Sequence, residues 1–260
     1  MSNQIDRKTL GLALGGGAVR GAAHVGVLEV LEEAGIRPNV IAGTSAGALV
    51  GGLYCAGVSV SELRYQATHV KWTSVGRVTR PRLGWFDMSP LQQRIDDLAA
   101  GQCFEDLSIP FTAVAADLLT GKMVELTEGS VSAAIRASCA IPGLFTPSLA
   151  GDRWLIDGGM VNNLPVSVAR RMGADYVIAV DVFPHDVASK APRNLVEIAL
   201  LTYRNLAELV NRERDEADLV IQPVSKSGGF WDLTRIATHI EQGRAAAEEV
   251  LPNLLDELRR

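Results

Sequence analysis

The strongest constraint on the fold of this 260-residue chain is a pattern in which short apolar runs end in glycine-containing turns. Residues 10–14 precede three glycines, residues 36–42 precede Gly-Thr-Ser-Ala-Gly, and residues 153–156 precede Asp-Gly-Gly. Apolar runs of this length that end at such breakers are typical of buried strands in a parallel sheet. Glycine at the turn lets the next helix approach the sheet closely. The pattern therefore predicts an α/β protein.

Strands and helices are expected to alternate along most of the sequence. Apolar runs predict strands at 10–14, 36–42, 109–117, 122–126, 153–156, 176–182 and 219–222. Helical spacing and end signals predict helices at 20–34, 46–56, 131–140, 165–172, 194–216 and 233–258. The stretch 58–108 is expected to consist of helices and loops. Since no long linker interrupts the chain, we predict a single domain over residues 1–260.

Composition and charge exclude several classes of protein. Apolar residues make up 47% of the chain, which supports a large core and argues against disorder. The 30 acidic and 25 basic residues leave a net charge of −5, so a nucleic-acid partner is not expected. Three widely spaced cysteines, Cys55, Cys103 and Cys139, form no C-x-x-C pair and predict neither disulfides nor a zinc site.

Two segments bear on the expected location of the protein. The first residues lack the apolar region of a secretory signal, so we expect a cytoplasmic protein. Residues 40–60 carry no charge and approach the length of a membrane span. Many of these positions are Gly, Ala, Ser or Thr, which lipid accommodates less favourably than Leu, Ile, Phe and Val. A buried strand, a turn and a helix are the better prediction for 40–60.

The turn at residues 43–47, Gly-Thr-Ser-Ala-Gly, matches the G-x-S-x-G pattern of a nucleophile elbow. In such an elbow the serine occupies a strained turn between a strand and a helix, and its hydroxyl projects from the turn. Gly43 and Gly47 would let the strand and helix pass without a Cβ clash, and the helix N-terminus would lie beneath Ser45. A plain strand-to-helix turn is the alternative interpretation.

The glycine loop at residues 15–21 lies at a second predicted strand–helix junction. Its bare amides could bind a phosphate or the oxyanion of an acyl-transfer intermediate. Arg20-Gly21-Ala22 replaces the Gly-Lys-Ser/Thr end of a P-loop. The third glycine of a dinucleotide fingerprint would fall at Arg20. The amides of Gly15, Gly16, Gly17 and Ala18 are therefore predicted to form an oxyanion hole.

A nucleophilic serine needs a base, and two arrangements remain open. One is a Ser-His-Asp triad. Its histidine would be His24, which we expect to be packed, or one of three in surface-like contexts: His69, His185 and His239. His185, which follows Asp157 in the chain order Ser, Asp, His of α/β-hydrolases, is kept as the rival base.

The other arrangement is a Ser-Asp dyad in which Asp157, before Gly158 and Gly159, reaches Ser45 directly. Burial would raise the low pKa that otherwise makes aspartate a weak base. An ordinary turn aspartate is the alternative for Asp157.

Four motifs in order resemble the patatin-like phospholipase family in its bacterial form. They are G-G-G-x-x-R-G at 15–21, G-T-S-A-G at 43–47, I-R-A-S at 135–138 with I-P-G-L-F at 141–145, and D-G-G at 157–159. The resemblance implies a three-layer α/β/α fold with a central, mostly parallel sheet. It also implies Ser45 as the nucleophile, Asp157 as the base and an oxyanion hole around 15–18, with no metal and no cofactor. Ala18 stands where many members have glycine, which leaves backbone donors in place.

The activity implied by this resemblance is acyl-ester hydrolysis on lipids, of the phospholipase A or lysophospholipase type. An acyl-thioesterase with the same site, and a non-hydrolytic lipid sensor or scaffold, remain alternatives. Lipid substrates need an apolar channel, and aromatic residues gather in the two least regular regions: Trp72, Trp85, Phe86, Phe104, Phe230 and Trp231. They would form either a cap over a substrate channel within 58–108 and a lip in peripheral contact with a membrane, or satellite core.

Overall fold

A computed structural model of the chain describes residues 8–79, 82–183, 191–210, 212–223 and 231–259. Its centre is an eight-stranded sheet in the order β11-β10-β1-β2-β5-β9-β8, with β6 also paired to β5. The strands are β1 (Leu10–Leu14), β2 (Val40–Thr44), β5 (Phe111–Asp117), β6 (Met123–Leu126), β8 (Ser148–Ala150), β9 (Arg153–Asp157), β10 (Tyr176–Val180) and β11 (Leu219–Ile221). The first five strands in that order are parallel, so the predicted mostly parallel sheet is confirmed.

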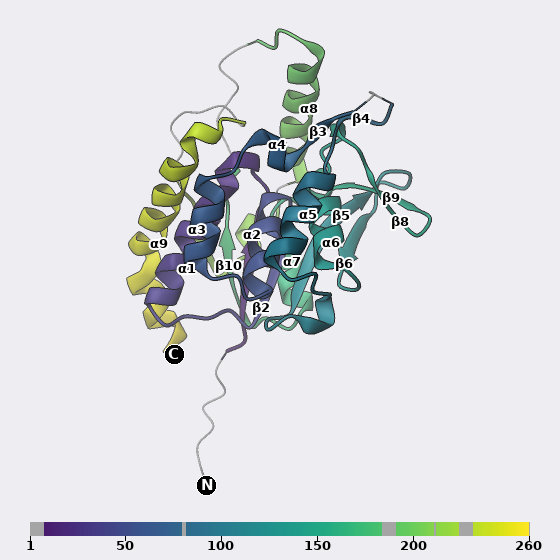
Figure 1. Cartoon of the computed structure of the whole chain (residues 1–260). Coiled ribbons are helices and arrows are strands. Elements are labelled where there is room, and N and C mark those ends of the chain that lie inside the picture. The colour runs from purple at the N-terminus through teal and green to yellow at the C-terminus, as the bar shows by residue number, and fades with distance from the viewer. Residues whose placement is uncertain (1–7, 80–81, 184–190, 211, 224–230, 260) are drawn as a thin grey trace.

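Helices cover both faces of this sheet (Figure 1). One face packs against α1 (Ala23–Glu33), α2 (Ala46–Cys55) and α9 (Ile236–Leu258), and the other against α7 (Val166–Arg171). Successive side chains of a strand pack on opposite faces of the sheet. In β1, Leu12 and Leu14 pack on the face covered by α1, and Ala13 packs on the face covered by α7. This division gives the layered α/β fold that the alternating pattern predicts.

The region 58–108 differs from its prediction of helices and loops. It contains α3 (Val60–Thr68), α4 (Trp72–Val75) and α5 (Ser89–Leu98), and also the strands β3 (Arg77–Val78) and β4 (Gly84–Asp87). These two strands form a second sheet with β7 (Gly143–Phe145), in the order β3-β4-β7. Strands of two to four residues are too short for a clear alternation, and β7 lies far along the chain, so no local pattern predicted them.

Several other boundaries shift. β2 starts at Val40 rather than residue 36, and β8 was not predicted. The predicted helix 194–216 is α8 (Leu195–Val210) followed by a short 3-10 helix, Glu213–Glu216. On α8 the apolar side chains of Leu195, Ile198 and Leu206 are exposed, while Tyr203 and Ala207 are buried. The amphipathic pattern therefore identified the helix, but not the side that packs.

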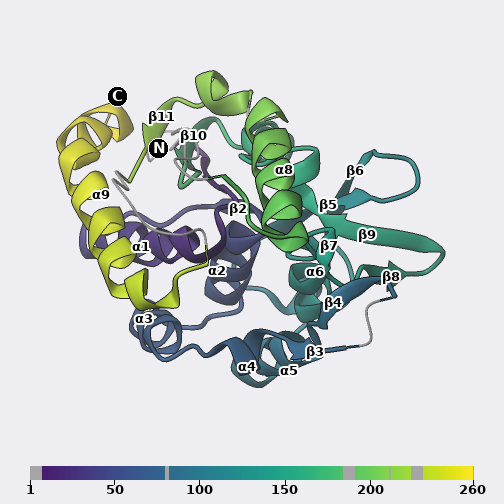
Figure 2. The same cartoon turned by 90° about the horizontal axis from the view of Figure 1, so that it is seen from above.

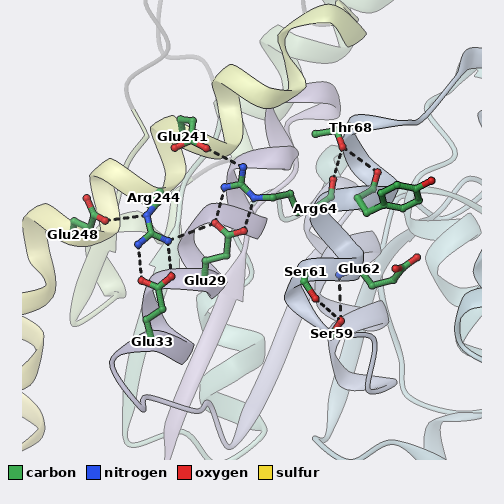
Figure 3. Close-up of polar contacts among 11 residues, drawn as sticks. Glu29, Glu33, Ser59, Ser61, Glu62, Arg64, Thr68, Glu241, Arg244 and Glu248 are labelled. Atoms are coloured by element: carbon green, nitrogen blue, oxygen red, sulfur yellow. Dashed lines mark hydrogen bonds and ion pairs between the residues drawn. The ribbon is translucent and has the colours of Figure 1, made fainter.

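Three helices at one side of the molecule are joined by close packing and ion pairs (Figures 2 and 3). A Cβ at Gly26 of α1 would lie 2.0 Å from the carbonyl oxygen of Ile240 in α9, so only glycine allows this approach. Arg64 of α3 contacts Glu29 at 2.6 Å and Glu241 at 2.9 Å (Figure 3). We call this connection of α1, α3 and α9 the helix brace.

Within the described part of the chain, each helix is either too short or too polar to cross a membrane. Residues 40–60 form β2, the following turn and α2, as predicted.

Candidate active site

Ser45 lies in the turn that joins β2 to α2. Its backbone has φ 52° and ψ −119°, a left-handed conformation that is strained for any residue with a Cβ. The turn is tight: a Cβ at Gly47 would lie 2.0 Å from the carbonyl oxygen of Leu14 in β1. A Cβ at Gly43 would lie 2.7 Å from the amide nitrogen of Ala48. The chain therefore has the backbone geometry of a nucleophile elbow, and glycine is needed where the pattern places it.

Hydrogen bonds from other elements hold this elbow in position. The N–H of Ser45 donates to Ser138 Oγ at 2.8 Å, and that hydroxyl donates to the carbonyl of Val114 at 2.6 Å. Thr44 Oγ1 donates to the carbonyl of Asn162 at 2.9 Å. Ser138 belongs to α6 (Val131–Ser138), which explains why its motif accompanies the elbow. These bonds fix a strained turn that would relax if it stood alone.

Asp157 ends β9, a strand that runs antiparallel to β5, and it lies close to Ser45. β5 lies between β2 and β9, pairing Thr44 with Val114 and Ala115 with Asp157. Because β9 runs antiparallel to β5, its last residue stops level with the end of β2. Two strand spacings, roughly 9.6 Å, separate the two backbones, a gap that two inward side chains span.

The carboxyl group of Asp157 is fully buried and has few partners. Its Oδ1 accepts hydrogen bonds from the N–H of Gly159 at 2.8 Å and from the hydroxyl of Tyr203 at 2.9 Å. Its Oδ2 is a buried oxygen to which no well-formed hydrogen bond within the described residues can be assigned. Burial raises the pKa of Asp157 to about 6, against the lowering effects of Gly159, the Ser45 hydroxyl and Tyr203. The carboxyl is thus close to Ser45 and more basic than an ordinary aspartate.

Tyr203 is a site residue that sequence reasoning missed. It lies on α8, is buried, and donates its hydroxyl proton to Asp157 Oδ1. Burial and the charge of Asp157 raise the pKa of Tyr203, so the phenol stays a donor. No local pattern marks a tyrosine within an amphipathic helix as a site residue. Only the docking of α8 beside the Asp157-Gly158-Gly159 turn brings it there.

The glycine loop lies next to the elbow, but only part of it has free amides. The N–H groups of Gly15 and Gly16 donate to the carbonyls of Val180 and Asn163, at 3.1 and 3.0 Å. Both are therefore occupied, which removes them from the donors predicted for an oxyanion hole. The amides of Gly17 and Ala18, at the start of the 3-10 helix Ala18–Ala22, have no acceptor among the described residues.

The loop is also close to Ser45. A Cβ at Gly16 would meet Ser45 Cβ at 3.3 Å and Asn163 Oδ1 at 2.5 Å. Ala18 has φ 50°, so this loop is strained as well. Asn163, which the sequence analysis did not single out, ties the loop to the turn that follows Asp157, because its Nδ2 also donates to the carbonyl of Gly16 at 3.3 Å.

The predicted glycines after Asp157 are needed for packing. A Cβ at Gly158 would lie 2.2 Å from the carbonyl oxygen of Val114, and one at Gly159 would lie 2.3 Å from the hydroxyl of Tyr203. A side chain at either position would displace β5 or α8 from Asp157. These two glycines therefore set how closely the elements of the site assemble.

The described histidines form no hydrogen bond to Ser45 or Asp157 in the part of the chain that the structure covers. His24 is buried, its Nε2 contacts the carbonyl oxygen of Gly15 at 2.8 Å, and burial lowers its pKa to about 4. His69 is exposed, as expected from its context. His239, expected near the surface, is buried in α9, which corrects that expectation. His185 lies outside the described residues.

An apolar cavity of about 210 Å³ extends from Ser45 between the helices. Its walls come from α2, α3 and α5, and also from the aromatic side chains of Trp72, Phe145 and Trp231. Phe104 instead stacks on Phe111 of the core, with ring centroids 5.9 Å apart. Of the aromatic residues singled out in the sequence, Trp72 and Trp231 line the cavity, Phe86 and Phe104 pack against the core, and Trp85 is exposed, while Phe230 lies outside the described residues.

The three cysteines are free thiols. In the described ranges no group of three or more His, Cys, Asp or Glu side chains is arranged to hold a metal ion.

The layered sheet, the strained serine after β2 and the buried aspartate beside it define an α/β protein whose β2–α2 turn has the backbone geometry of a nucleophile elbow. The sequence model of the patatin-like phospholipase family matches residues 12–170, more than half of the chain. The chain belongs to the patatin-like phospholipase family.

Two relatives agree with this assignment. The chain is 40% identical over 174 residues to an uncharacterized NTE family protein of Mycobacterium tuberculosis, covering 66% of this chain and 48% of that protein. It is 37% identical over 189 residues to human patatin-like phospholipase domain-containing protein 6, covering 68% of this chain and 14% of that protein. The chain thus spans about half, or much less, of the length of these curated relatives.

Among solved structures, VipD from Legionella pneumophila matches with a TM-score of 0.58 at 14% identity, over 95% of this chain and 67% of that chain. The type III effector protein ExoU matches with a TM-score of 0.50 at 14% identity, over 95% of this chain and 53% of that chain. These similarities support the fold.

Proposed function

We propose that this protein is a serine acyl hydrolase that cleaves acyl esters of lipids with a Ser45–Asp157 dyad. The observation that carries the proposal is the meeting of a strained serine, a buried aspartate of raised pKa and an apolar cavity at one point. A scaffold or lipid sensor would have no use for the strain at Ser45 or for the burial of Asp157, since both oppose stability.

In the proposed acylation step, Ser45 Oγ attacks the ester carbonyl while its proton passes to Asp157. The Oδ2 atom is the acceptor, since Oδ1 already holds the hydrogen bonds of Gly159 and Tyr203. A pKa near 6 leaves the carboxylate ionised at neutral pH and brings its basicity closer to what proton transfer needs. Asp157 then returns the proton to the leaving alcohol, and the acyl group stays on Ser45.

The oxyanion of this step is proposed to lie against the amides of Gly17 and Ala18. These are the loop amides left without an acceptor, and backbone donors stabilise developing negative charge without reorganisation. Water then gives a proton to Asp157 and attacks the acyl-enzyme. The bond between the acyl carbon and Ser45 Oγ breaks, Asp157 returns the proton to Ser45 Oγ, and the fatty acid leaves. The reaction uses no metal and no cofactor in this proposal.

The apolar cavity supports a long acyl chain as the part of the substrate that is recognised. Its lining is almost wholly aliphatic and aromatic, with Ser45 in its wall, so the ester carbon and the chain would be held together. We propose phospholipid or lysophospholipid esters as the substrate class. We further propose that the protein acts in the cytoplasm, in peripheral contact with a membrane.

Covalent labelling tests the nucleophile. A fluorophosphonate probe should modify Ser45 and should fail to label the Ser45→Ala variant. Ser148→Ala is the matched control, because Ser148 is also buried but lies on β8, and its hydroxyl makes no hydrogen bond within the described residues. Its labelling should equal that of the wild type. Labelling that survives in Ser45→Ala would contradict the assignment.

Two further variants separate the dyad from a triad. Asp157→Asn should abolish ester turnover, whereas His185→Ala should leave it intact; the reverse result would favour a histidine base. A panel of phospholipids, lysophospholipids, acylglycerols, acyl thioesters and short p-nitrophenyl esters then defines the leaving group. Absence of turnover on every member would refute hydrolysis and favour a lipid sensor.

A further inference from the structure

A surface segment beside the cavity has a charge opposite to that of the whole protein. Residues 71–79 and 82–85, which we call the basic lip, contain Lys71, Arg77 and Arg82 and no acidic residue, in a chain of net charge −5. Lys71 and Arg82 are exposed and form no ion pair with the described acidic residues. Arg77 contacts Asp87 at 3.2 Å, yet its side chain remains 73% exposed. The lip therefore presents positive charge to solvent.

The same segment exposes large apolar side chains. Val78 is 73% exposed and Leu83 is 58% exposed, while Trp72 and Trp85 are each 44% exposed. Exposed apolar side chains gathered on one short segment are unusual on a surface that faces water only. Tryptophan, with an apolar ring and a polar N–H, favours the boundary between water and lipid.

The basic lip is continuous with the entrance of the apolar cavity. Trp72 lines the cavity and is also exposed, so the cavity reaches the surface beside it. The ring of Trp72 lies 5.9 Å from that of Trp231, another lining residue. β4, whose first two residues belong to the lip, pairs with β7, which carries the lining residue Phe145. Figure 1 shows α4, β3 and β4 at one end of the molecule, away from both termini.

We propose that the basic lip docks this protein on the surface of an anionic lipid bilayer, with the cavity entrance facing the membrane. The basic side chains complement anionic headgroups, and the apolar side chains between them enter the boundary of the acyl region. A nucleic acid would use the charge but not the exposed Val78 and Leu83. The lipid-substrate role of this surface rests on the proposed function, but the docking itself needs no catalysis.

Vesicle binding tests the proposal directly. The full chain carrying Ser45→Ala, which prevents lipid consumption, is titrated with vesicles of phosphatidylcholine alone and of phosphatidylcholine with phosphatidylglycerol in equal parts. Binding should be much tighter to the anionic vesicles and should weaken as salt is raised, because salt screens surface charges. Equal binding to both vesicles would overturn the role of charge.

A triple variant assigns the binding to the lip. Each basic side chain at an anionic surface strengthens binding about fivefold, so Lys71→Gln/Arg77→Gln/Arg82→Gln should lose on the order of a hundredfold. Lys8→Gln/Arg37→Gln/Arg259→Gln removes the same charge at the opposite end of the sheet and should bind like its parent. Val78→Ser/Leu83→Ser should lose about tenfold with less salt dependence.

The outcomes distinguish docking from catalysis. Both triple variants should unfold at the same temperature, so a selective loss in the lip variant reports binding. Equal losses in the two triple variants, or tighter binding to single-stranded RNA than to anionic vesicles, would refute the docking surface. If the protein binds vesicles but hydrolyses no ester, the docking surface is supported and the proposed hydrolase is refuted. If the protein hydrolyses soluble esters but does not bind vesicles, the hydrolase is supported and the docking surface is refuted.

Discussion

At the scale of single residues, Asp157 combines burial with an incomplete set of hydrogen bonds. Its two donors, Gly159 and Tyr203, meet one carboxylate oxygen, and the other lies in a buried position beside Ser45. A carboxylate that served only to hold the fold would be fully paired. The charge of Asp157 therefore opposes folding, and its protonation favours folding.

The first prediction follows from the sign of this effect. The folded-state pKa of Asp157, about 6, exceeds its ordinary value of 3.8, so the folded state binds the proton more tightly. Stability contributed by Asp157 is therefore present below pH 4 and lost as pH rises through 6. The unfolding free energy of the Asp157→Asn variant should exceed that of the wild type by up to about 3 kcal/mol at pH 8. At pH 4 the difference should be small, because the wild-type carboxyl is then protonated.

Urea denaturation at both pH values measures this difference. Asp117→Asn is the control of opposite sign. Hydrogen bonds from the backbone N–H of Thr120 and Leu119 lower the pKa of Asp117 in the folded state. Its charge stabilises the fold above pH 4, and that stability is lost on acidification. An Asp157→Asn gain that is the same at pH 4 and pH 8 would contradict burial as the cause.

The second prediction concerns Tyr203 as a positioning residue. Tyr203→Phe removes a donor to Asp157, and because that hydrogen bond lowers the carboxyl pKa, the pKa should rise further. If Asp157 is the base, the acid limb of kcat/KM should move to higher pH by about one unit. Tyr54→Phe, which removes a hydrogen bond to Glu32 away from the site, should leave the limb unchanged. If the acid limb of the kcat/KM profile is unchanged in Tyr203→Phe, the proposed positioning role of Tyr203 is wrong.

At the scale of elements, the glycines act through the distances between strands and helices. Gly47 has no room for a Cβ because the carbonyl of Leu14 would lie 2.0 Å from it. Gly173, in contrast, has φ 97° and open space around it, so it is needed only for its backbone conformation. A substitution at Gly47 therefore tests packing, and a substitution at Gly173 tests backbone strain.

The third prediction compares these two glycines. Gly47→Ala should force α2 away from β1 and cost more than about 3 kcal/mol of unfolding free energy, as overpacked cores do. Gly173→Ala should cost about 1 kcal/mol, the usual penalty for a Cβ at positive φ. Chemical denaturation measures both. Equal losses would mean that the approach of α2 to β1 is not limiting.

Local patterns predicted the elements whose signals are contiguous. β1, β2 and α2 each have a run, a breaker and a period within a few residues, and the elbow at Ser45 lies where they meet. β3, β4 and β7 form only by pairing across the chain, so their residues carry no alternation to detect. Tyr203 and Asn163 were missed for the same reason, since tertiary contacts alone bring them to the site.

Local sequence patterns also could not show which backbone amides of the predicted oxyanion hole are free to donate. Gly15 to Ala18 were predicted as four equivalent donors, yet two of their amides are consumed by Val180 and Asn163. Those partners lie on segments that no pattern connects to residues 15–18. The roles of Ser45 and Asp157, and the extent of a single domain over residues 1–260, remain predictions.

At the scale of the whole molecule, the helix brace connects segments from both halves of the chain (Figure 3). Arg244 of α9 contacts Glu33 of α1 at 2.8 Å and Glu248 of α9 at 3.1 Å. The cavity has lining residues on α1, α3 and, through Ile236, on α9. The brace thus holds together three helices that enclose the apolar space.

The fourth prediction tests how much this network stabilises the fold. Arg244→Gln should lower the unfolding free energy measurably at low salt, and by less at high salt, because the pairs are partly exposed and screened. Arg259→Gln, whose pair with Asp256 is highly exposed, should change stability little at either salt concentration. An Arg244→Gln loss that does not depend on salt would indicate packing of its side chain rather than charge.

The antiparallel course of β9 also determines when the site can exist. A ribosome releases the elbow residue Ser45 early, but Asp157 reaches it only after β9 has paired with β5, and Tyr203 only after α8 has docked. β1 likewise waits for β10 as its second partner. Contacts of such long sequence separation form late. A half-synthesised chain therefore carries the serine without its aspartate, and the complete pair appears only in a molecule that has finished folding.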